Sequence, residues 1–132
     1  MTATYIAGMS EPADASPSPP DLLFVIDAVD TDLLADFWAA ALGYRRADSV
    51  EQYEILLPAD GRPGPMFLVQ GVSEPKVAKN RMHVDLHVDD PDAEAARLVG
   101  LGAERRGSGS LGEISWIVMA DPEGNEFDIG RR

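Results

Sequence analysis

The chain has 132 residues, 45% of them hydrophobic, which is the size of a single domain with enough apolar side chains to close a core. It contains no cysteine, and this excludes disulfides and thiolate metal sites. With 23 acidic residues against 11 basic ones, the formal net charge is −12, so we expect neither nucleic acid nor an anionic membrane as a partner.

The first half of the chain predicts an arm, a strand, a helix and three further strands. Residues 1–20 are rich in Pro, Ser and Ala and are expected to form an extended arm, after which the domain spans residues 21–132. A strand at Leu22–Val29 leads to a helix that Asp30 or Thr31 caps and Gly43 ends. Three more strands are expected at Tyr44–Ser49, Gln52–Leu57 and Met66–Gln70.

The second half predicts the same order of elements. A strand at Met82–Val88 precedes a helix at Ala93–Leu101, which Asp90 caps and Gly102 ends. The glycine-rich segment 107–112 is expected to form a flexible hairpin or a lid, because no helix follows it. The remaining strands are expected at Ala103–Gly107, Ile114–Met119 and Glu126–Ile129.

The two halves are also similar in sequence. A shift of 59 positions lays Phe24–Arg46 on His83–Arg105 without a gap, with an identical Leu-Gly pair at the end of each expected helix. This repeat predicts an α+β fold of two βαβββ modules, at about residues 21–71 and 82–130, related by pseudo-two-fold symmetry. We expect their mixed β-sheet to form a cup around a cavity, with the helices on the outer face.

Strand alternation predicts which side chains face this cavity. The aliphatic face of the Met82–Val88 strand belongs under the helix and carries Val84, Leu86 and Val88. The opposite face should look into the cavity and carries His83, Asp85 and His87. In the first strand, the shared valines place Val25, Asp27 and Val29 toward the helix.

Three segments carry the most specific pattern of the chain: Asp27–Gly43 with its Phe-Trp pair, Lys79–Leu86, and Trp116–Phe127 with its Asp-Pro-Glu-Gly-Asn turn. Together they resemble the glyoxalase/bleomycin resistance/extradiol dioxygenase superfamily, also named vicinal oxygen chelate proteins, and within it the glyoxalase-like branch. The resemblance covers roughly Asp21 to Ile129. It implies the two-module fold but many different activities, because one fold supports many functions.

Metal-dependent members of this superfamily hold a divalent ion with His, Glu or Gln residues, one on the first strand and one on the last strand of each module. The resemblance places His83 and Asp128 at these positions in the second module, and both can be ligands. The 59-residue shift puts Phe24 and Val69 at the matching positions of the first module, where neither can bind a metal. Gln70 could take part only if its strand slipped by one residue. We therefore predict a degenerate site and no metal cofactor; a bound metal would be held by His83 and Asp128.

Three functions are compatible with these residues. The favoured prediction is a glyoxalase-like protein that binds a hydrophobic or aromatic small molecule between the modules. The first alternative is a metal-independent isomerase, cyclase or epimerase in which His83, with Asp85 or Asp128, acts as acid or base, although His83 can also be purely structural. The second alternative is a divalent-metal lyase or dioxygenase. The expected substrate-binding residues are Phe24, Phe67, Gln70, His83, His87, Trp116 and Asp128.

The location and assembly of the protein are also expectations. The chain contains neither a run of about 18 apolar residues nor a basic, apolar leader, so we expect a cytoplasmic protein. Because relatives in the superfamily often pair their modules between chains, the resemblance implies a homodimer.

Overall fold

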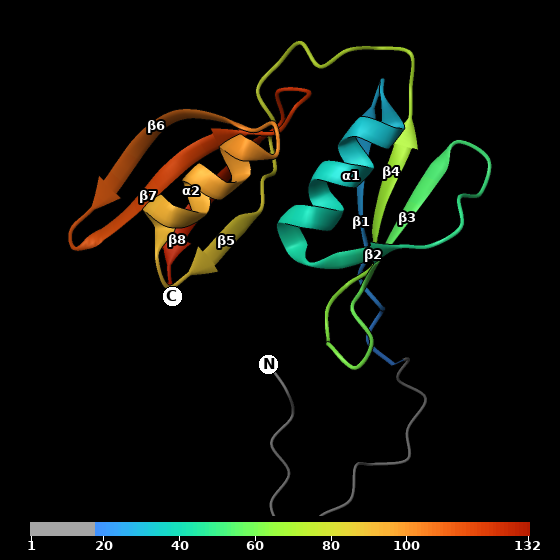
Figure 1. The fold of residues 1–132 in the computed structure, drawn as a ribbon, viewed down its shortest axis with the longest axis horizontal. Helices are drawn as coiled ribbons and strands as arrows, with labels where there is room; N and C mark the ends of the chain where they lie inside the picture. Colours follow the sequence, from blue (N-terminus) through green and yellow to red (C-terminus); the bar gives the residue numbers. More distant parts are fainter. Residues whose placement is uncertain (1–17) are drawn as a thin grey trace, which may run out of the picture.

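The computed structural model describes residues 18–132, so residues 1–17 of the expected arm lie outside the described part (Figure 1). The first module contains β1 (Phe24–Ala28), α1 (Thr31–Leu42), β2 (Tyr44–Arg46), β3 (Tyr53–Pro58) and β4 (Phe67–Gly71). The second contains β5 (Asp85–Val88), α2 (Pro91–Gly100), β6 (Glu104–Leu111), β7 (Ile114–Ala120) and β8 (Glu126–Arg131). The order β-α-β-β-β, twice, is confirmed.

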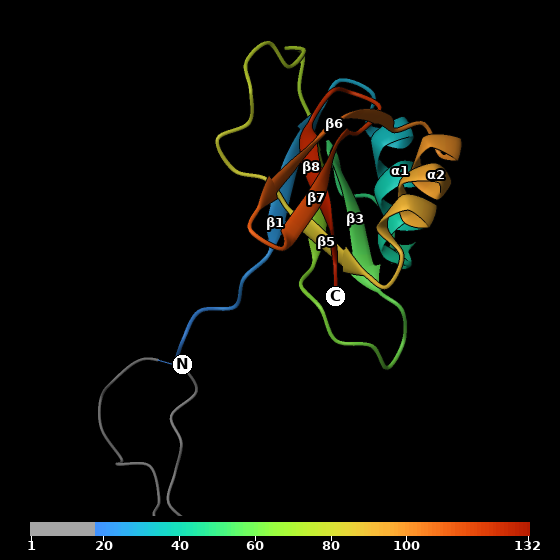
Figure 2. The same cartoon turned by 90° about the vertical axis from the view of Figure 1, so that its left-hand side faces the viewer.

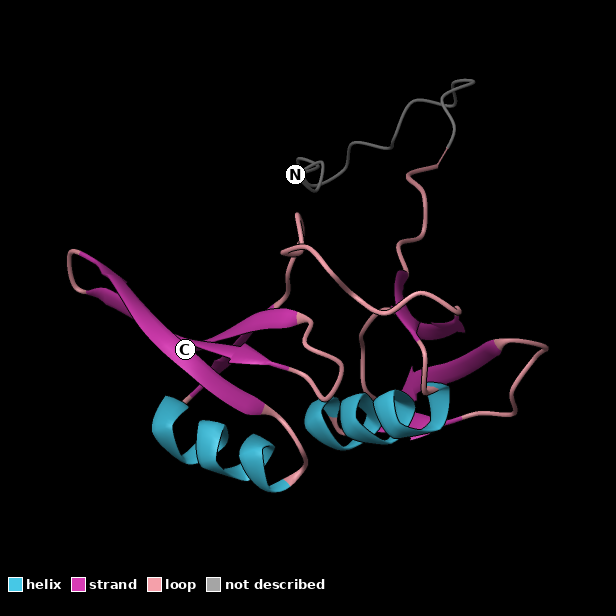
Figure 3. Cartoon of the chain, turned by 90° about the horizontal axis from the view of Figure 1, so that it is seen from above, coloured by secondary structure: helices cyan, strands magenta, loops and turns pink. Residues whose placement is uncertain are grey.

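Each module forms its own mixed sheet of four strands. The strand orders are β1-β4-β3-β2 and β5-β8-β7-β6, and in both sheets the first strand pairs in parallel with the last one. Both helices lie on the same side of the molecule, and each covers one face of its sheet (Figures 2 and 3). Among residues 18–132, no helix lies on the opposite face of either sheet. The predicted α+β fold of two βαβββ modules is therefore confirmed, although the sheet is two sheets rather than one.

Local sequence explains where both helices begin and where α1 ends. The side chain of Asp30 accepts a hydrogen bond from the backbone N–H of Leu33, and Asp90 does the same for Ala93, each at 3.1 Å. Gly43 ends α1 with a φ of 68°, which glycine adopts without a steric penalty. The second helix begins at Pro91, which the sequence places in the first turn after the Asp90 cap, and its C-terminal cap is Leu101 in place of the predicted Gly102.

The hydrophobic core continues from one module into the other. The Trp38 ring of α1 lies 5.1 Å from the Phe127 ring of β8, centroid to centroid, and both side chains are at most 1% exposed. The indole N–H of Trp38 donates a 3.0 Å hydrogen bond to the buried carboxylate of Asp121, in the turn before β8. Trp38 is thus a core residue, as its helical spacing predicts.

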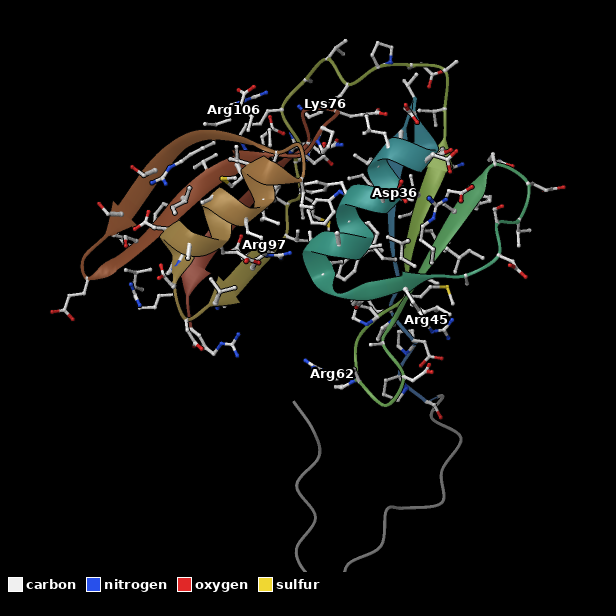
Figure 4. All side chains as sticks on the ribbon, viewed as in Figure 1. Asp36, Arg45, Arg62, Lys76, Arg97 and Arg106 are labelled. Carbon is white, nitrogen blue, oxygen red and sulfur yellow. The ribbon has the colours of Figure 1, made fainter. Side chains whose placement is uncertain are left out.

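Two polar contacts add to this junction. Glu123 accepts hydrogen bonds from the backbone N–H groups of Val29 and Asp30 at the start of α1, at 2.8 and 2.6 Å. Arg97 of α2 donates to the backbone carbonyls of Ala40 and Ala41 at the end of α1, and Figure 4 shows its side chain between the two helices. Both ends of α1 are therefore bound by the second module.

The face predicted for the first strand is wrong. Val25 and Val29 are 49% and 52% exposed and Asp27 is exposed, whereas the core side of β1 carries Phe24, Ile26 and Ala28. In the second module the prediction holds, since Val84, Leu86 and Val88 pack against the core.

The reason for this error is the register of the repeat. The helix N-caps Asp30 and Asp90 are 60 residues apart, and the core pair Ile26 and Val69 corresponds to Leu86 and Ile129, again 60 apart. The identical Leu-Gly pairs at the helix ends are 59 apart, because α2 is shorter than α1. A shift of one residue moves a strand's side chains to the opposite face.

Within residues 18–132, neither helix has the length and apolar character required to cross a membrane.

Candidate functional site

The central feature of the uncovered face of the second sheet is a cluster of one imidazole and two carboxylates, which we name the His83 cluster. Nε2 of His83 lies 3.1 Å from Oδ1 of Asp85 and 3.3 Å from Oδ2 of Asp128. Asp85 and Asp128 are register partners on β5 and β8, and His83 stands two residues before Asp85, on the same face. The sequence predicted that His83 and Asp85 share a face, and parallel pairing of the two strands adds Asp128.

The cluster is partly exposed, and its least exposed member is Asp128. The side chain of Asp128 is 18% exposed, against 40% for His83 and 51% for Asp85. Burial, together with the negative charge of Asp85, raises the pKa of Asp128 above its usual range, and the positive charges of His83 and Lys79 oppose this rise. A carboxyl in this setting can take up and release a proton next to an imidazole.

A first cavity of about 490 Å³ lies between the modules. Its apolar wall comes from the first module and includes Phe24, Phe67 and Trp38. Its polar wall comes from the second module and the connection that precedes it, and includes Lys76, Asn80, His83 and Glu126.

A second cavity of about 900 Å³ lies over the uncovered face of the second sheet. Its floor contains the three members of the His83 cluster together with His87, Trp116 and Gly130. His83 and Glu126 line both cavities, so the two spaces adjoin at these residues.

The expected substrate-binding residues divide between these two spaces. Phe24 and Phe67 line the first cavity, and their rings lie 6.2 Å apart. His87, Trp116 and Asp128 line the second, and His83 lines both. Gln70 lines neither cavity: it pairs with Asp27 on the uncovered face of the first sheet.

Sequence reasoning missed the strap that closes the first cavity, formed by residues 72–82 between β4 and β5. Glu126 on β8 holds it: its carboxylate accepts hydrogen bonds from Lys76, labelled in Figure 4, at 3.1 Å and from the backbone N–H of Asn80 at 3.0 Å. Burial opposes the ionised form, but these two donors lower the pKa of Glu126 to about 2. No local signal in the sequence relates Glu126 to residues about 50 positions earlier.

Sequence reasoning also missed two glycines next to the rings of the second cavity: Gly130, which lines the cavity, and Gly109, which lies against the Trp116 ring. A Cβ atom at Gly109 would lie 2.4 Å from the Trp116 ring, and one at Gly130 would lie 3.3 Å from the His87 ring. Both rings therefore lie against strands where a side chain is absent. The segment 107–112, expected to form a flexible hairpin or a lid, forms most of β6 and the start of its hairpin with β7, so it is part of a hairpin and not a lid.

The register of 60 residues changes which first-module residues correspond to the cluster. The counterparts of His83, Asp85 and Asp128 are Leu23, Val25 and Leu68, not Phe24 and Val69. Phe24 and Val69 pack toward the core. The residues differ from those expected, but they are again hydrocarbons, so the first module offers no metal ligand at these positions.

The His83 cluster itself fits a divalent cation. Its three donor atoms lie within 4.8 Å of one another, and the two measured separations of 3.1 and 3.3 Å match neighbouring donors of an octahedral ion, which are about 3 Å apart. Two carboxylates and one imidazole suit Mg²⁺ or Mn²⁺ better than Zn²⁺. An ion held there by His83, Asp85 and Asp128 would polarise an oxygen atom of a bound molecule.

Comparison of structures finds the same fold in proteins of low sequence identity. FosX, a fosfomycin resistance protein of Listeria monocytogenes, is similar with a TM-score of 0.69 at 14% identity, over 88% of this chain and 95% of FosX. A glyoxalase/bleomycin resistance protein/dioxygenase family enzyme of Burkholderia phytofirmans PsJN gives 0.68 at 16%, over 85% and 98%. The bleomycin-binding protein of Streptomyces verticillus, solved with copper(II)-bleomycin, gives 0.60 at 17%, over 89% and 99%.

In the comparison of sequences, no curated protein matches the chain, but a family model does. A family model described as the glyoxalase-like domain matches residues 23–130, which includes every strand of both sheets except the last residue of β8. The chain therefore belongs to the glyoxalase-like domain family, and it shares its fold with FosX and with the bleomycin-binding protein.

Proposed function

We propose that this protein binds a hydrophobic or aromatic small molecule in the cavities that meet at His83. The supporting observation is their lining: aromatic rings on both sides of a small polar cluster, with Phe24, Phe67 and Trp38 in the first cavity and Trp116 and His87 in the second. Apolar walls with a few convergent polar groups are typical of small-molecule sites. The bleomycin-binding protein of similar fold, solved with bound copper(II)-bleomycin, supports the same class of function.

A thermal-shift screen tests this proposal. A ligand that binds only the folded protein raises the melting temperature, by an amount that grows with its concentration. We expect hydrophobic and aromatic compounds to stabilise the protein, and polar sugars of similar size to have no effect. The proposal is wrong if no hydrophobic or aromatic compound raises the melting temperature.

We further propose that the family's metal site is degenerate here and that the protein works without a metal. The hydrocarbon side chains of Leu23, Val25 and Leu68 at the first-module positions support this proposal, although the three donors of the second module fit a cation. Elemental analysis of protein grown with Mn, Fe, Co, Ni and Zn should find substoichiometric metal. Stoichiometric metal that is lost in His83→Ala would instead favour the divalent-metal lyase or dioxygenase.

The geometry of the His83 cluster favours one second candidate, a metal-independent isomerase, cyclase or epimerase. An imidazole within 3.1 and 3.3 Å of two carboxylates is a suitable acid–base pair, with Asp85 and Asp128 orienting His83. If so, His83→Ala abolishes turnover of a bound substrate while its affinity changes little. A variant that only melts at a lower temperature would show that His83 is structural.

We propose that the protein is a cytoplasmic homodimer. Apolar side chains at and before β1, with Leu22, Leu23 and Val25 exposed by 71%, 45% and 49%, support a covered surface on the first sheet. Light scattering after size exclusion should give the mass of two chains for the wild type. The Val25→Glu variant should give the mass of one chain. A wild-type monomer at all accessible concentrations would contradict the dimer.

A further inference from the structure

The uncovered face of the second sheet, beneath the second cavity, carries two rows of residues across its strands. One row contains Asp85, Asp128 and Val118, which are register partners on β5, β8 and β7. The next row, two residues further along, contains His87, Gly130, Trp116 and Gly109, register partners on all four strands. The first row is acidic and the second is aromatic. Side chains two residues apart on one face of a strand are about 7 Å from each other, so the rows are separated by that distance.

The two glycines give the aromatic row its shape. Neither Gly109 nor Gly130 has a positive φ, so their backbone conformation does not require glycine. What requires glycine is space: a Cβ at Gly109 would lie at 2.4 Å from two atoms of the Trp116 ring, closer than any real contact. The glycines thus allow the two rings to lie low against the sheet and leave the 900 Å³ above them open.

The acidic row determines what else a ligand needs. Ionised carboxylates accept hydrogen bonds and cannot donate them, so Asp85 and Asp128 favour a ligand with N–H donors and disfavour an anion. Both arginines that line this cavity already donate a hydrogen bond to a backbone carbonyl, Arg131 to that of Asp89 and Arg132 to that of His87. Lys79 also lines the cavity and lies near enough to Asp128 to act on its charge.

We propose that the second cavity takes a planar aromatic amine, whose ring rests on the row of His87 and Trp116 and whose amino group reaches Asp85 and Asp128 about 7 Å away. The inference rests on the proposed small-molecule function and assigns its ligand class and subsite. An amino group gives both carboxylates a donor, and a flat ring is the shape that fits above two rings lying against the sheet. Metal-free carboxylates disfavour a phosphonate or another anion at this place.

Calorimetry with three probes tests the ligand class. Proflavine is a flat tricyclic amine, anthracene-9-carboxylate is a flat anion, and adamantan-1-amine is an amine without a flat ring. We expect proflavine to bind at least about tenfold more tightly than either of the others, a difference of about 1.4 kcal/mol. Equal or tighter binding of the anion would overturn the acidic part of the proposal, and equal binding of the adamantyl amine would overturn the aromatic part.

A matched pair of glycine variants tests the subsite. Gly109→Ala forces the Trp116 ring out of its place, whereas Gly107→Ala, on the same strand, meets no atom within 4 Å and does not line the cavity. We expect Gly109→Ala to weaken proflavine binding by about tenfold or more and Gly107→Ala by less than about twofold. If Gly109→Ala does not fold, Trp116→Leu replaces it, because this exposed-side ring carries none of the core. An unchanged affinity in both Gly109→Ala and Trp116→Leu would overturn the subsite.

The same measurements separate this inference from the proposed function. A different outcome is that compounds stabilise the protein while their affinities change in Val72→Phe, in the first cavity, and not in the second-cavity variants. In that case the proposed function holds, but the aromatic row is not the binding site. If no compound stabilises the wild-type protein, the proposed function itself is wrong.

Discussion

At the level of single residues, Glu126 carries a contact between distant parts of the chain. Its carboxylate holds Lys76 and the backbone of Asn80, and so fixes the strap over the first cavity. Since His83 follows this strap directly, Glu126 also determines where the imidazole of the cluster stands. The residue thus lines the cavities and also holds the strap that leads to His83.

We predict that Glu126→Gln lowers the free energy of unfolding by about 1 kcal/mol at neutral pH, because a charged acceptor of two hydrogen bonds is lost. The folded-state pKa of about 2 lies below the ordinary 4.5, so ionised Glu126 stabilises the fold above about pH 4.5 and this contribution is lost as pH falls toward 2. Urea unfolding should therefore show the difference between wild type and variant shrinking over this window. Glu113→Gln, at the exposed hairpin tip, is the control and should change stability by less than about 0.5 kcal/mol.

Asp121 is a second acidic residue that binds a distant part of the chain, since its carboxylate accepts a hydrogen bond from Trp38. It is 3% exposed and accepts hydrogen bonds from the Trp38 indole and from the backbone N–H groups of Glu123 and Asn125. Burial raises its pKa, and these bonds oppose that rise.

We predict that Asp121→Ala lowers the free energy of unfolding by about 2–3 kcal/mol, since it leaves buried donors without an acceptor. Urea denaturation followed by Trp38 fluorescence measures the loss. Asp60→Ala, at an exposed ion pair with Arg45, is the control and should change stability by less than about 0.5 kcal/mol. A similar loss in both variants would show that Asp121 carries no special role.

At the level of elements, the first residues of the two helices show how a one-residue change in the alignment of the modules changes which strand face is assigned to the core. The gapless repeat pairs Asp30 with Asp89, whereas the structure assigns the two N-caps to Asp30 and Asp90. The strand before each helix keeps the same spacing to its cap in both modules. The caps therefore indicate which side chains of that strand face the core and which face the uncovered side.

We predict that Asp30→Ala and Asp90→Ala each cost about 1 kcal/mol, the usual loss of an N-cap. Asp89→Ala should cost little, because its side chain makes only an exposed ion pair with Arg132. Chemical denaturation of the three variants measures these losses. An equal loss in Asp89→Ala and Asp90→Ala would contradict the 60-residue register.

At the level of the whole molecule, the two modules share one core and one junction. Phe127 of the second module packs against Phe37 and Trp38 of α1, and polar contacts bind both ends of that helix. Neither module buries its apolar surface alone, so both should unfold together.

We predict that Phe127→Ala lowers the free energy of unfolding by about 3–5 kcal/mol, the cost of truncating a buried phenyl ring. In the wild type, tryptophan fluorescence, from Trp38 and Trp116, and far-ultraviolet circular dichroism should report one common transition. Leu111→Ala, at a side chain 72% exposed, is the control and should change stability by less than about 0.5 kcal/mol. Two separate transitions in the wild type would show that the modules are independent.

Much of the fold follows from local rules that can be applied to the sequence alone. Strand alternation predicted that His83 and Asp85 share a face, and cap and stop residues predicted both ends of α1. The duplicated order of elements was sufficient for the fold class. These features depend only on neighbours within a few residues, which is why the sequence determines them.

The tertiary structure alone decided which residues meet across the molecule. The resemblance already related Asp128 to His83, but only parallel pairing of β5 with β8 sets their 3.3 Å separation, and only the folded chain shows that Glu126 reaches back to the strap. The core, not the identities of the repeat, placed Phe24 and Val69 inward and set the face of β1. The spacing from the N-cap to the Leu-Gly pair differs by one residue between the two modules. Aligning the modules on the wrong end of the helix therefore assigns a strand's side chains to the opposite face, and only packing against the rest of the protein shows which alignment is right.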